Sequence, residues 1–216
     1  MKHESQHGWT LQPGALTLAD LRAAWSAHRP IALSPDAAAP IAASSALVDT
    51  IVAKGDPAYG INTGFGILAK AHIPNDQLAQ LQRNLILSHA VGTGELLSDA
   101  VVRLILLTKI GSLARGYSGV RPLIIDTLIA LYNAGIMPAI PSQGSVGASG
   151  DLAPLAHMTL AILGVGQVRA NGRLNRHIIH LAGNQVFHLL NQCDTTMARI
   201  LTVTNHRQGI HLFAIN

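Results

Sequence analysis

The chain has 216 residues, of which 49% are hydrophobic, 12% charged and 4% aromatic, and its formal net charge is +4. A hydrophobic fraction of this size can form a sizeable core, which argues against a disordered chain. The charged fraction is about half the globular average of roughly 25%, so much of the surface should be covered by an oligomer interface or by further chain.

Helical patterns begin close to the N-terminus. Thr17 and Asp20 have the spacing of a capping box, which predicts a helix through about residue 25. A second helix is expected over residues 34–54, with Ser34 as its N-cap residue. Pro40 should force a restart or a kink in that helix, because it removes a backbone donor.

A third helix is indicated by four residues spaced three or four positions apart. Leu78, Leu81, Leu85 and His89 would share one helical face, and the helix should end near Gly92. The expected buried side of this helix is therefore the side that carries His89.

Three more helices are expected over 99–115, 122–134 and 151–164. The first is apolar nearly all round, which is typical of a buried helix. Asn171-Gly172 is a strong turn signal and predicts a small β-hairpin near residues 166–174. The predicted fold class is therefore mainly α with one hairpin.

Two glycine-rich segments, 59–66 and 144–151, interrupt the helical pattern. The plain interpretation of both is an ordinary surface turn. The second segment lacks the Lys and Ser/Thr of a phosphate loop, the spacing of a nucleophile elbow and the βαβ context of a dinucleotide site. These three kinds of site are excluded.

Ala148-Ser149-Gly150 suits a different chemistry, which is closure of the chain on itself. The Gly150 nitrogen can attack the Ala148 carbonyl carbon, and loss of two molecules of water leaves an imidazolone with an alkene from Ser149. Glycine leaves room for ring closure, and serine supplies the leaving hydroxyl. The product is an electrophile that no standard side chain provides, and a helix beginning near Asp151 would direct its positive end towards it.

Four segments together resemble the aromatic amino acid ammonia-lyases, in the order and spacing of that family. They are Tyr59–Gly66, Asn84–Gly94, Gly116–Pro122 and the signature Gly144–Met158. The resemblance covers roughly residues 8 to 174. It implies the N-terminal portion of the helical, aspartase/fumarase-like fold of these lyases.

Within that family, Ser88-His89 implies L-histidine as the substrate. The implied reaction is elimination of ammonia to give trans-urocanate, the opening step of histidine degradation, while a related aminomutase stays open. The resemblance further implies a self-formed 4-methylidene-imidazol-5-one, no external cofactor and a homotetramer.

The resemblance also implies a role for each matching residue. Ala148, Ser149 and Gly150 would form the methylidene-imidazolone, and Tyr59 would remove the β-proton. His89 would contact the substrate imidazole or assist proton movement, and Asp151 would assist ring formation. Taken singly, Tyr59 and His89 are more often packing residues, and Asp151 is more often a helix N-cap. His157 is interpreted as structural.

The resemblance stops after Leu174. We therefore expect an incomplete ammonia-lyase N-terminal domain over 1–174 and a non-matching tail over 175–216, for which the hypothesis is a frameshift. Such a fragment would expose helices 99–115 and 122–134, and it could be inactive alone. The alternative function is a non-catalytic fragment that associates with intact lyase subunits. The tail holds five of the eleven histidines, but it lacks the carboxylate or thiolate set typical of a metal site, so no metal site is predicted.

Other classes of protein find little support. The single cysteine, Cys193, excludes a disulfide framework. Met1–His7 lacks the apolar segment of a secretory signal, and no run approaches the ~18 apolar residues of a membrane helix. Few aromatics and no charge blocks argue against nucleic-acid binding, although the basic pI near 9.6 suggests it weakly. We expect a cytoplasmic protein whose partner is a small-molecule substrate.

Overall fold

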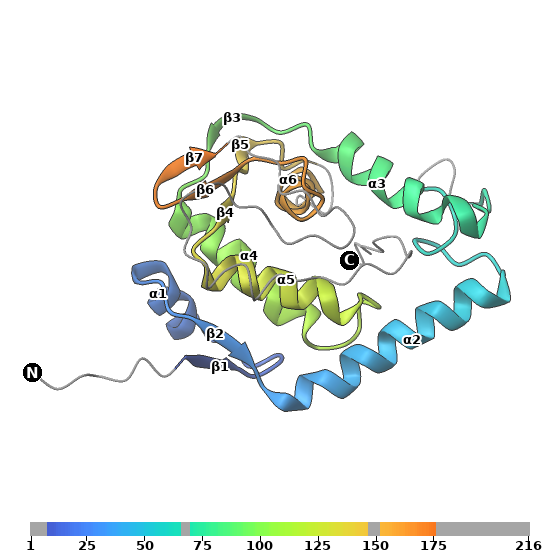
Figure 1. Ribbon diagram of the computed structural model, residues 1–216, viewed down its shortest axis with the longest axis horizontal. Coiled ribbons are helices and arrows are strands. Elements are labelled where there is room, and N and C mark those ends of the chain that lie inside the picture. The colour runs from blue at the N-terminus through green and yellow to red at the C-terminus, as the bar shows by residue number, and fades with distance from the viewer. Residues whose placement is uncertain (1–7, 66–69, 147–151, 176–216) are drawn as a thin grey trace, which may run out of the picture.

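The computed structural model describes residues 8–65, 70–146 and 152–175 (Figure 1). Helices dominate this part of the chain, as predicted. They are α1 (Leu18–Ser26), α2 (Ala38–Lys54), α3 (Leu78–His89), α4 (Asp99–Leu113), α5 (Pro122–Asn133) and α6 (Leu152–Ile162), with 3-10 turns at Pro35–Ala37 and Asn75–Gln77. The strands are short: β1 (Trp9–Leu11), β2 (Ile31–Leu33), β3 (Thr93–Leu96), β4 (Met137–Pro138), β5 (Pro141–Gln143), β6 (Val168–Ala170) and β7 (Arg173–Asn175).

Helix α1 begins with the predicted capping box. The Asp20 backbone donates to Thr17 Oγ1 at 3.2 Å, and the Thr17 backbone donates to Asp20 Oδ2 at 2.9 Å. These two bonds satisfy backbone donors that the first helical turn leaves free. Ser34 is the N-cap residue of the Pro35–Ala37 turn, as predicted, although its side chain makes no capping bond to the backbone.

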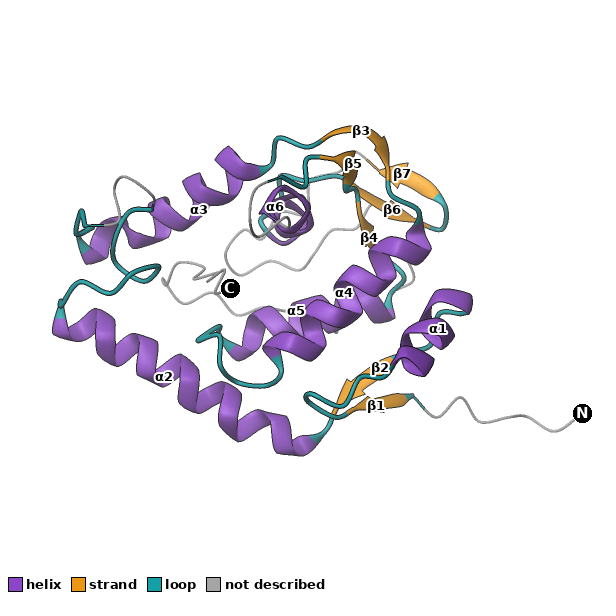
Figure 2. Ribbon diagram, turned by 180° about the vertical axis from the view of Figure 1, so that it is seen from behind, coloured by secondary structure: helices purple, strands orange, loops and turns teal. Residues whose placement is uncertain are grey.

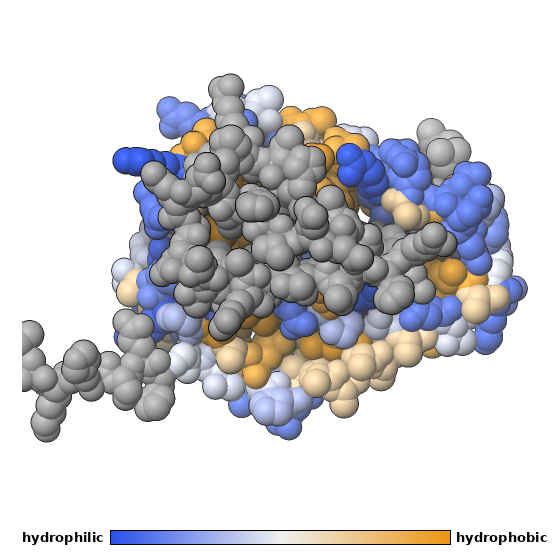
Figure 3. All heavy atoms as spheres, viewed as in Figure 1, coloured by the Kyte–Doolittle hydropathy of each residue, from blue (hydrophilic) through white to orange (hydrophobic). Residues whose placement is uncertain are grey.

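The helix over 35–54 changes character before Pro40. It opens as a 3-10 turn and continues as α2, so Pro40 lies in the first α-helical turn, where a missing N–H costs little. By length and composition alone, the 20-residue segment Pro35–Lys54 could cross a membrane, since an 18-residue window of it has mean hydropathy 1.3. One such helix is weak support for a membrane span. Most of its surface is exposed, and Figure 3 shows a band of light-orange residues over α2.

The core lies around α4 and α5, at the centre of both ribbon views (Figures 1 and 2). Helix α1 packs on α4, and α2 packs on α5. The fully buried side chains of the two central helices include Val102, Leu106, Ile110, Ile124 and Leu128. The expectation that these helices would be exposed is therefore wrong, because the described part of the chain already covers their apolar faces.

Helix α3 packs against α6, on a face one position away from the predicted one. Leu78, Gln82 and Ile86 are its buried residues, whereas Leu81 and Leu85 are only partly buried. The periodicity of α3 and the burial of Leu78 were therefore predicted correctly, whereas Gln82 and Ile86 take the buried positions expected for Leu81 and Leu85. The position of α6 decides which side is covered.

The predicted hairpin is formed by β6 and β7. Its turn places Asn171 at φ 51° and Gly172 at φ 71°, the left-handed backbone that this dipeptide tolerates. Strand β4 extends the hairpin to a three-stranded sheet. Arg169 Nε bonds Asp99 Oδ1 at 2.6 Å and so fixes the hairpin to the start of α4. The parallel pair β1–β2 and the antiparallel pair β3–β5 were not predicted.

Candidate active site

His89 is the last residue of α3, and its ring is fixed through one nitrogen. Nδ1 lies 2.8 Å from the Leu85 carbonyl oxygen and 3.1 Å from Ser88 Oγ. A carbonyl oxygen only accepts, so Nδ1 carries the proton of this bond. Among the described residues, Nε2 has no hydrogen-bond partner, and it is the ring atom available to a ligand.

The chain turns sharply after His89. The Val91 N–H donates to the His89 carbonyl oxygen at 2.9 Å. The next N–H, that of Gly92, donates to Nε2 of His157 at 3.0 Å, across 65 residues of sequence. Helix α6, which carries His157, thereby holds the backbone that follows His89.

Gly92 and Gly144 lie in close contact. A β-carbon on Gly92 would lie 3.1 Å from both the Gln143 carbonyl oxygen and His157 Nε2. A β-carbon on Gly144, at φ +147°, would lie 2.9 Å from Gly92 Cα and 3.2 Å from Ala153 Cβ. Only glycine at positions 92 and 144 allows the two backbones to approach this closely.

This contact brings both ends of the segment 144–153 together beside the end of α3. Strand β5 pairs with β3, with Gln143 opposite Thr93, and α6 returns the chain at Ala153. The predicted site residues Ala148, Ser149, Gly150 and Asp151 lie within this segment and outside the described residues. The fold thus places Gly144 and Ala153, the two ends of the segment that contains the predicted electrophile, beside Gly92, three residues after His89.

Tyr59 belongs to a different loop, between α2 and α3. Its side chain is 68% exposed, and its ring meets the Phe65 ring edge-on at a centroid distance of 5.8 Å. Asn62 is fully buried and organises the loop, accepting from the Ala58 N–H at 2.7 Å and donating to the Asp56 carbonyl oxygen at 2.9 Å. The described contacts of Tyr59 do not include His89.

The electrostatics of the site favour a neutral His157. Burial lowers the pKa of His157 below its ordinary value of 6.5, because a charged ring would lose hydration. A neutral ring retains the lone pair that accepts from Gly92. In the ranges that the structure describes, no three His, Cys, Asp or Glu side chains form a group that could hold a metal ion.

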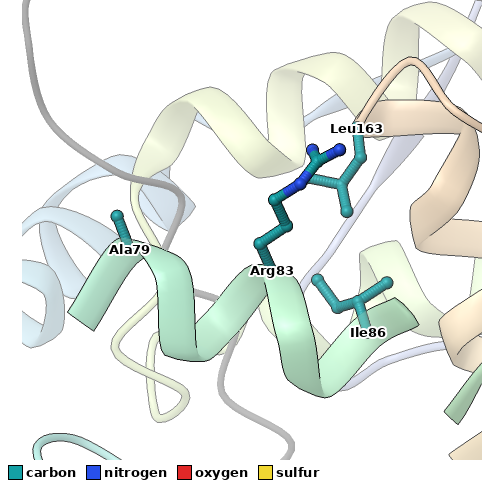
Figure 4. Close-up of a pocket in the computed structure, with 4 residues that line it drawn as sticks. All are labelled: Ala79, Arg83, Ile86 and Leu163. Carbon is teal, nitrogen blue, oxygen red and sulfur yellow. The ribbon is translucent and has the colours of Figure 1, made fainter. Parts of the chain in front are cut away.

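A small pocket lies between α3 and the end of α6 (Figure 4). It is lined by Ala79, Arg83, Ile86 and Leu163, and the Arg83 side chain extends from α3 towards Leu163. This pocket adjoins the α3–α6 contact but contains none of the predicted site residues.

The structure therefore joins two parts of the predicted site and leaves a third apart. His89 and the ends of the electrophile-forming segment meet at Gly92, whereas Tyr59 lies on a separate exposed loop. His157 was interpreted as structural, and its bond to the Gly92 N–H agrees with that interpretation. Its partner could not be predicted from sequence, because the two residues lie 65 positions apart.

Comparison with known proteins places these features in one family. The sequence model of aromatic amino acid lyases matches residues 16–189. A histidine ammonia-lyase of Aromatoleum aromaticum is 56% identical over 163 residues, which are 76% of this chain and 31% of that protein. The chain thus spans about a third of the length of the curated relatives it matches.

Solved structures agree with this similarity. Histidine ammonia-lyase from Trypanosoma cruzi matches 77% of this chain and 32% of its own, with TM-score 0.69 and 35% identity. A phenylalanine aminomutase of Pantoea agglomerans matches 78% of this chain and 32% of its own, with TM-score 0.71 and 31% identity. The predicted helical fold is confirmed. The family match extends past residue 174, to residue 189, whereas the nature of residues 175–216 stays a prediction because residues 176–216 lie outside the described part.

Proposed function

The chain belongs to the aromatic amino acid lyase family, and we propose that it forms the electrophile-bearing part of a histidine ammonia-lyase. The reaction is elimination of ammonia from L-histidine to give trans-urocanate. The C–N bond at the α-carbon and one C–H bond at the β-carbon break, a C=C bond forms, and ammonia and a proton leave. The observation that carries the proposal is the meeting of Gly144, Gly92 and Ala153 beside the His89 end of α3.

The residues present fit a self-formed methylidene-imidazolone. Formation needs a tripeptide whose flanks are held while its backbone bends on itself. Gly144 and Ala153 are such flanks, since a β-carbon on Gly144 would lie 3.2 Å from Ala153 Cβ and 2.9 Å from Gly92 Cα, and Gly92 is bonded to His157 of α6. The group, once made from Ala148, Ser149 and Gly150, supplies the electrophile that ammonia elimination requires.

His89 is proposed to orient the substrate. Its Nδ1 is fixed at the end of α3 by the Leu85 carbonyl oxygen, which leaves Nε2 as the hydrogen-bond acceptor of the ring. A substrate imidazole N–H can donate to that atom. This arrangement selects a ring with an N–H group over a phenyl ring, which offers no donor.

Tyr59 is proposed to accept the β-proton at its phenol oxygen. The buried Asn62 and the Phe65 contact hold the Tyr59 loop in place. The Tyr59 side chain is 68% exposed in this chain. A working site would therefore need cover from outside the described residues, which agrees with the chain spanning a third of its relatives.

Intact-mass measurement of the purified 216-residue chain tests the proposal most directly. The expected mass is short of the translated sequence by two molecules of water, with the loss mapped to the peptide that contains Ser149. Ser149→Ala should abolish the loss, because the leaving hydroxyl is gone. Ser145→Ala, a change of the exposed serine in the same segment, is the matched control and should retain it.

Incubation with L-histidine then tests the substrate. Release of urocanate, absent with L-phenylalanine and in the Ser149→Ala chain, would support the full proposal. A mass loss without turnover would support the electrophile and show that the rest of the site is missing. An unshortened mass in the unaltered chain would contradict formation of the electrophile here.

A further inference from the structure

His157 connects the chain that follows His89 to α6, the helix that follows the electrophile-forming segment. The proposed function gives it no chemical role. It lies on α6, five residues past the start of that helix at Leu152, and its Nε2 accepts from the Gly92 N–H at 3.0 Å. Gly92 follows His89 by three residues, directly after the tight turn that the Val91 N–H closes on the His89 carbonyl oxygen. The position of His157 therefore restricts where the end of α3 can lie.

We propose that His157 is a positioning residue that holds the His89 end of α3 against the base of the 144–153 segment. The imidazole acts through a single acceptor atom, Nε2, on the backbone of Gly92. The consequence for catalysis rests on the proposed lyase function. The positioning itself is a property of this chain.

The packing at Gly92 explains why a histidine suits this position. The Gly92 backbone fills the space between the Gln143 carbonyl oxygen and the His157 ring, with each about 3.1 Å from where a β-carbon would be. A partly buried N–H left there without an acceptor would destabilise this arrangement. The His157 ring supplies the acceptor for the Gly92 N–H. The same ring lies so close to Gly92 that it leaves little room for a side chain at that position.

The tautomer of His157 follows from the same bond. Because Nε2 accepts from an N–H, the ring proton of neutral His157 lies on Nδ1. Burial lowers the pKa of this ring, which agrees with a neutral acceptor. His89 has its proton on the same atom, Nδ1, but it leaves Nε2 available to a ligand.

Three variants distinguish the effect of the acceptor atom of His157 from the effect of its side-chain volume. His157→Leu removes the acceptor, and His157→Gln keeps one, because its Oε1 can reach a position close to that of Nε2. Thr159→Val is the matched control, since Thr159 is buried on the same helix but bonds only Leu155 within α6. Circular dichroism first establishes that each variant is folded.

Nuclear magnetic resonance of the labelled 216-residue chain gives the first readout. We expect an Nδ1-protonated tautomer for His157 and slow exchange of the Gly92 amide. In His157→Leu that amide should exchange about tenfold faster, the equivalent of one lost hydrogen bond, and the His89 ring signals should shift. His157→Gln should restore both. Unchanged Gly92 exchange or unchanged His89 signals in His157→Leu would overturn the proposal.

The rate of mass loss gives the second readout and separates this proposal from the proposed function. If the unaltered chain cyclises, His157→Leu should do so about tenfold more slowly, with rescue in His157→Gln. Equal rates in all variants would overturn the role of His157 in the site. If no chain loses water, the proposed function fails for this chain, and the Gly92 and His89 readouts alone decide the positioning.

Discussion

Gly144 lies so close to Gly92 that a β-carbon on Gly144 would come within 2.9 Å of the Gly92 α-carbon. This backbone contact between segments about fifty residues apart in sequence joins β5 and the start of the signature loop to the chain that follows His89. The loss of stability on substitution of Gly144 therefore measures how closely the backbone is packed at the candidate site.

We expect Gly144→Ala to lower the free energy of unfolding by about 2–4 kcal/mol, from an overpacked contact and a φ of +147° that alanine disfavours. Urea denaturation measures the change. Gly55→Ala is the control, because Gly55 has φ +76° but open space around it, and it should lose only about 1 kcal/mol. Equal losses in the two variants would contradict the close contact.

Asn133 connects α5 to β2 through both ends of its carboxamide. Oδ1 accepts from the Ile31 N–H at 2.7 Å, and Nδ2 donates to the Ile31 carbonyl oxygen at 2.8 Å. Asn133→Ala should cost about 2–3 kcal/mol, because both backbone groups of a buried residue lose their partner. Asn75→Ala removes a single exposed bond and should stay within about 0.5 kcal/mol. If Asn133→Ala lowered the free energy of unfolding only slightly, water would be shown to replace the amide as the partner of Ile31.

Gln82 is 1% exposed, and neither atom of its amide has a hydrogen-bond partner within the residues that the structure describes. Gln82→Met keeps the volume and removes the unpaired groups, so it should raise the free energy of unfolding by about 1 kcal/mol. Gln80→Met is the control on the exposed side of α3, where Gln80 bonds Asn84. Destabilisation by Gln82→Met would reveal a partner for the amide outside the described residues.

The pKa of His157 predicts a pH dependence of stability. Burial lowers the pKa of the folded ring below 6.5, so between that lowered value and 6.5 the unfolded chain binds more protons. The contribution of His157 is complete above pH ~6.5 and decreases as the pH falls below it. Urea midpoints near pH ~7.5 and ~5.5 should therefore differ less in His157→Gln than in the unaltered chain. The same difference in both would contradict a buried neutral ring.

The helices and the chemistry of the signature loop could be predicted from sequence because they depend on local rules. The Thr17–Asp20 capping box, the Asn171-Gly172 turn and the helix that starts at Pro122 follow from residues within a few positions of each other. The ring-forming potential of Ala148-Ser149-Gly150 is likewise a property of three adjacent residues.

Tertiary structure alone decided which surfaces meet. Nothing local in α3 shows that its buried stripe is Leu78, Gln82 and Ile86, since the position of α6 settles that. The strand pairs β1–β2 and β3–β5 are too short to leave a periodic signal. The bond between His157 and Gly92 joins residues 65 positions apart, and only the packing of α3 on α6 brings an acceptor to that backbone N–H. Local spacing thus determined the elements and the chemistry, and long-range packing determined which residues surround that chemistry.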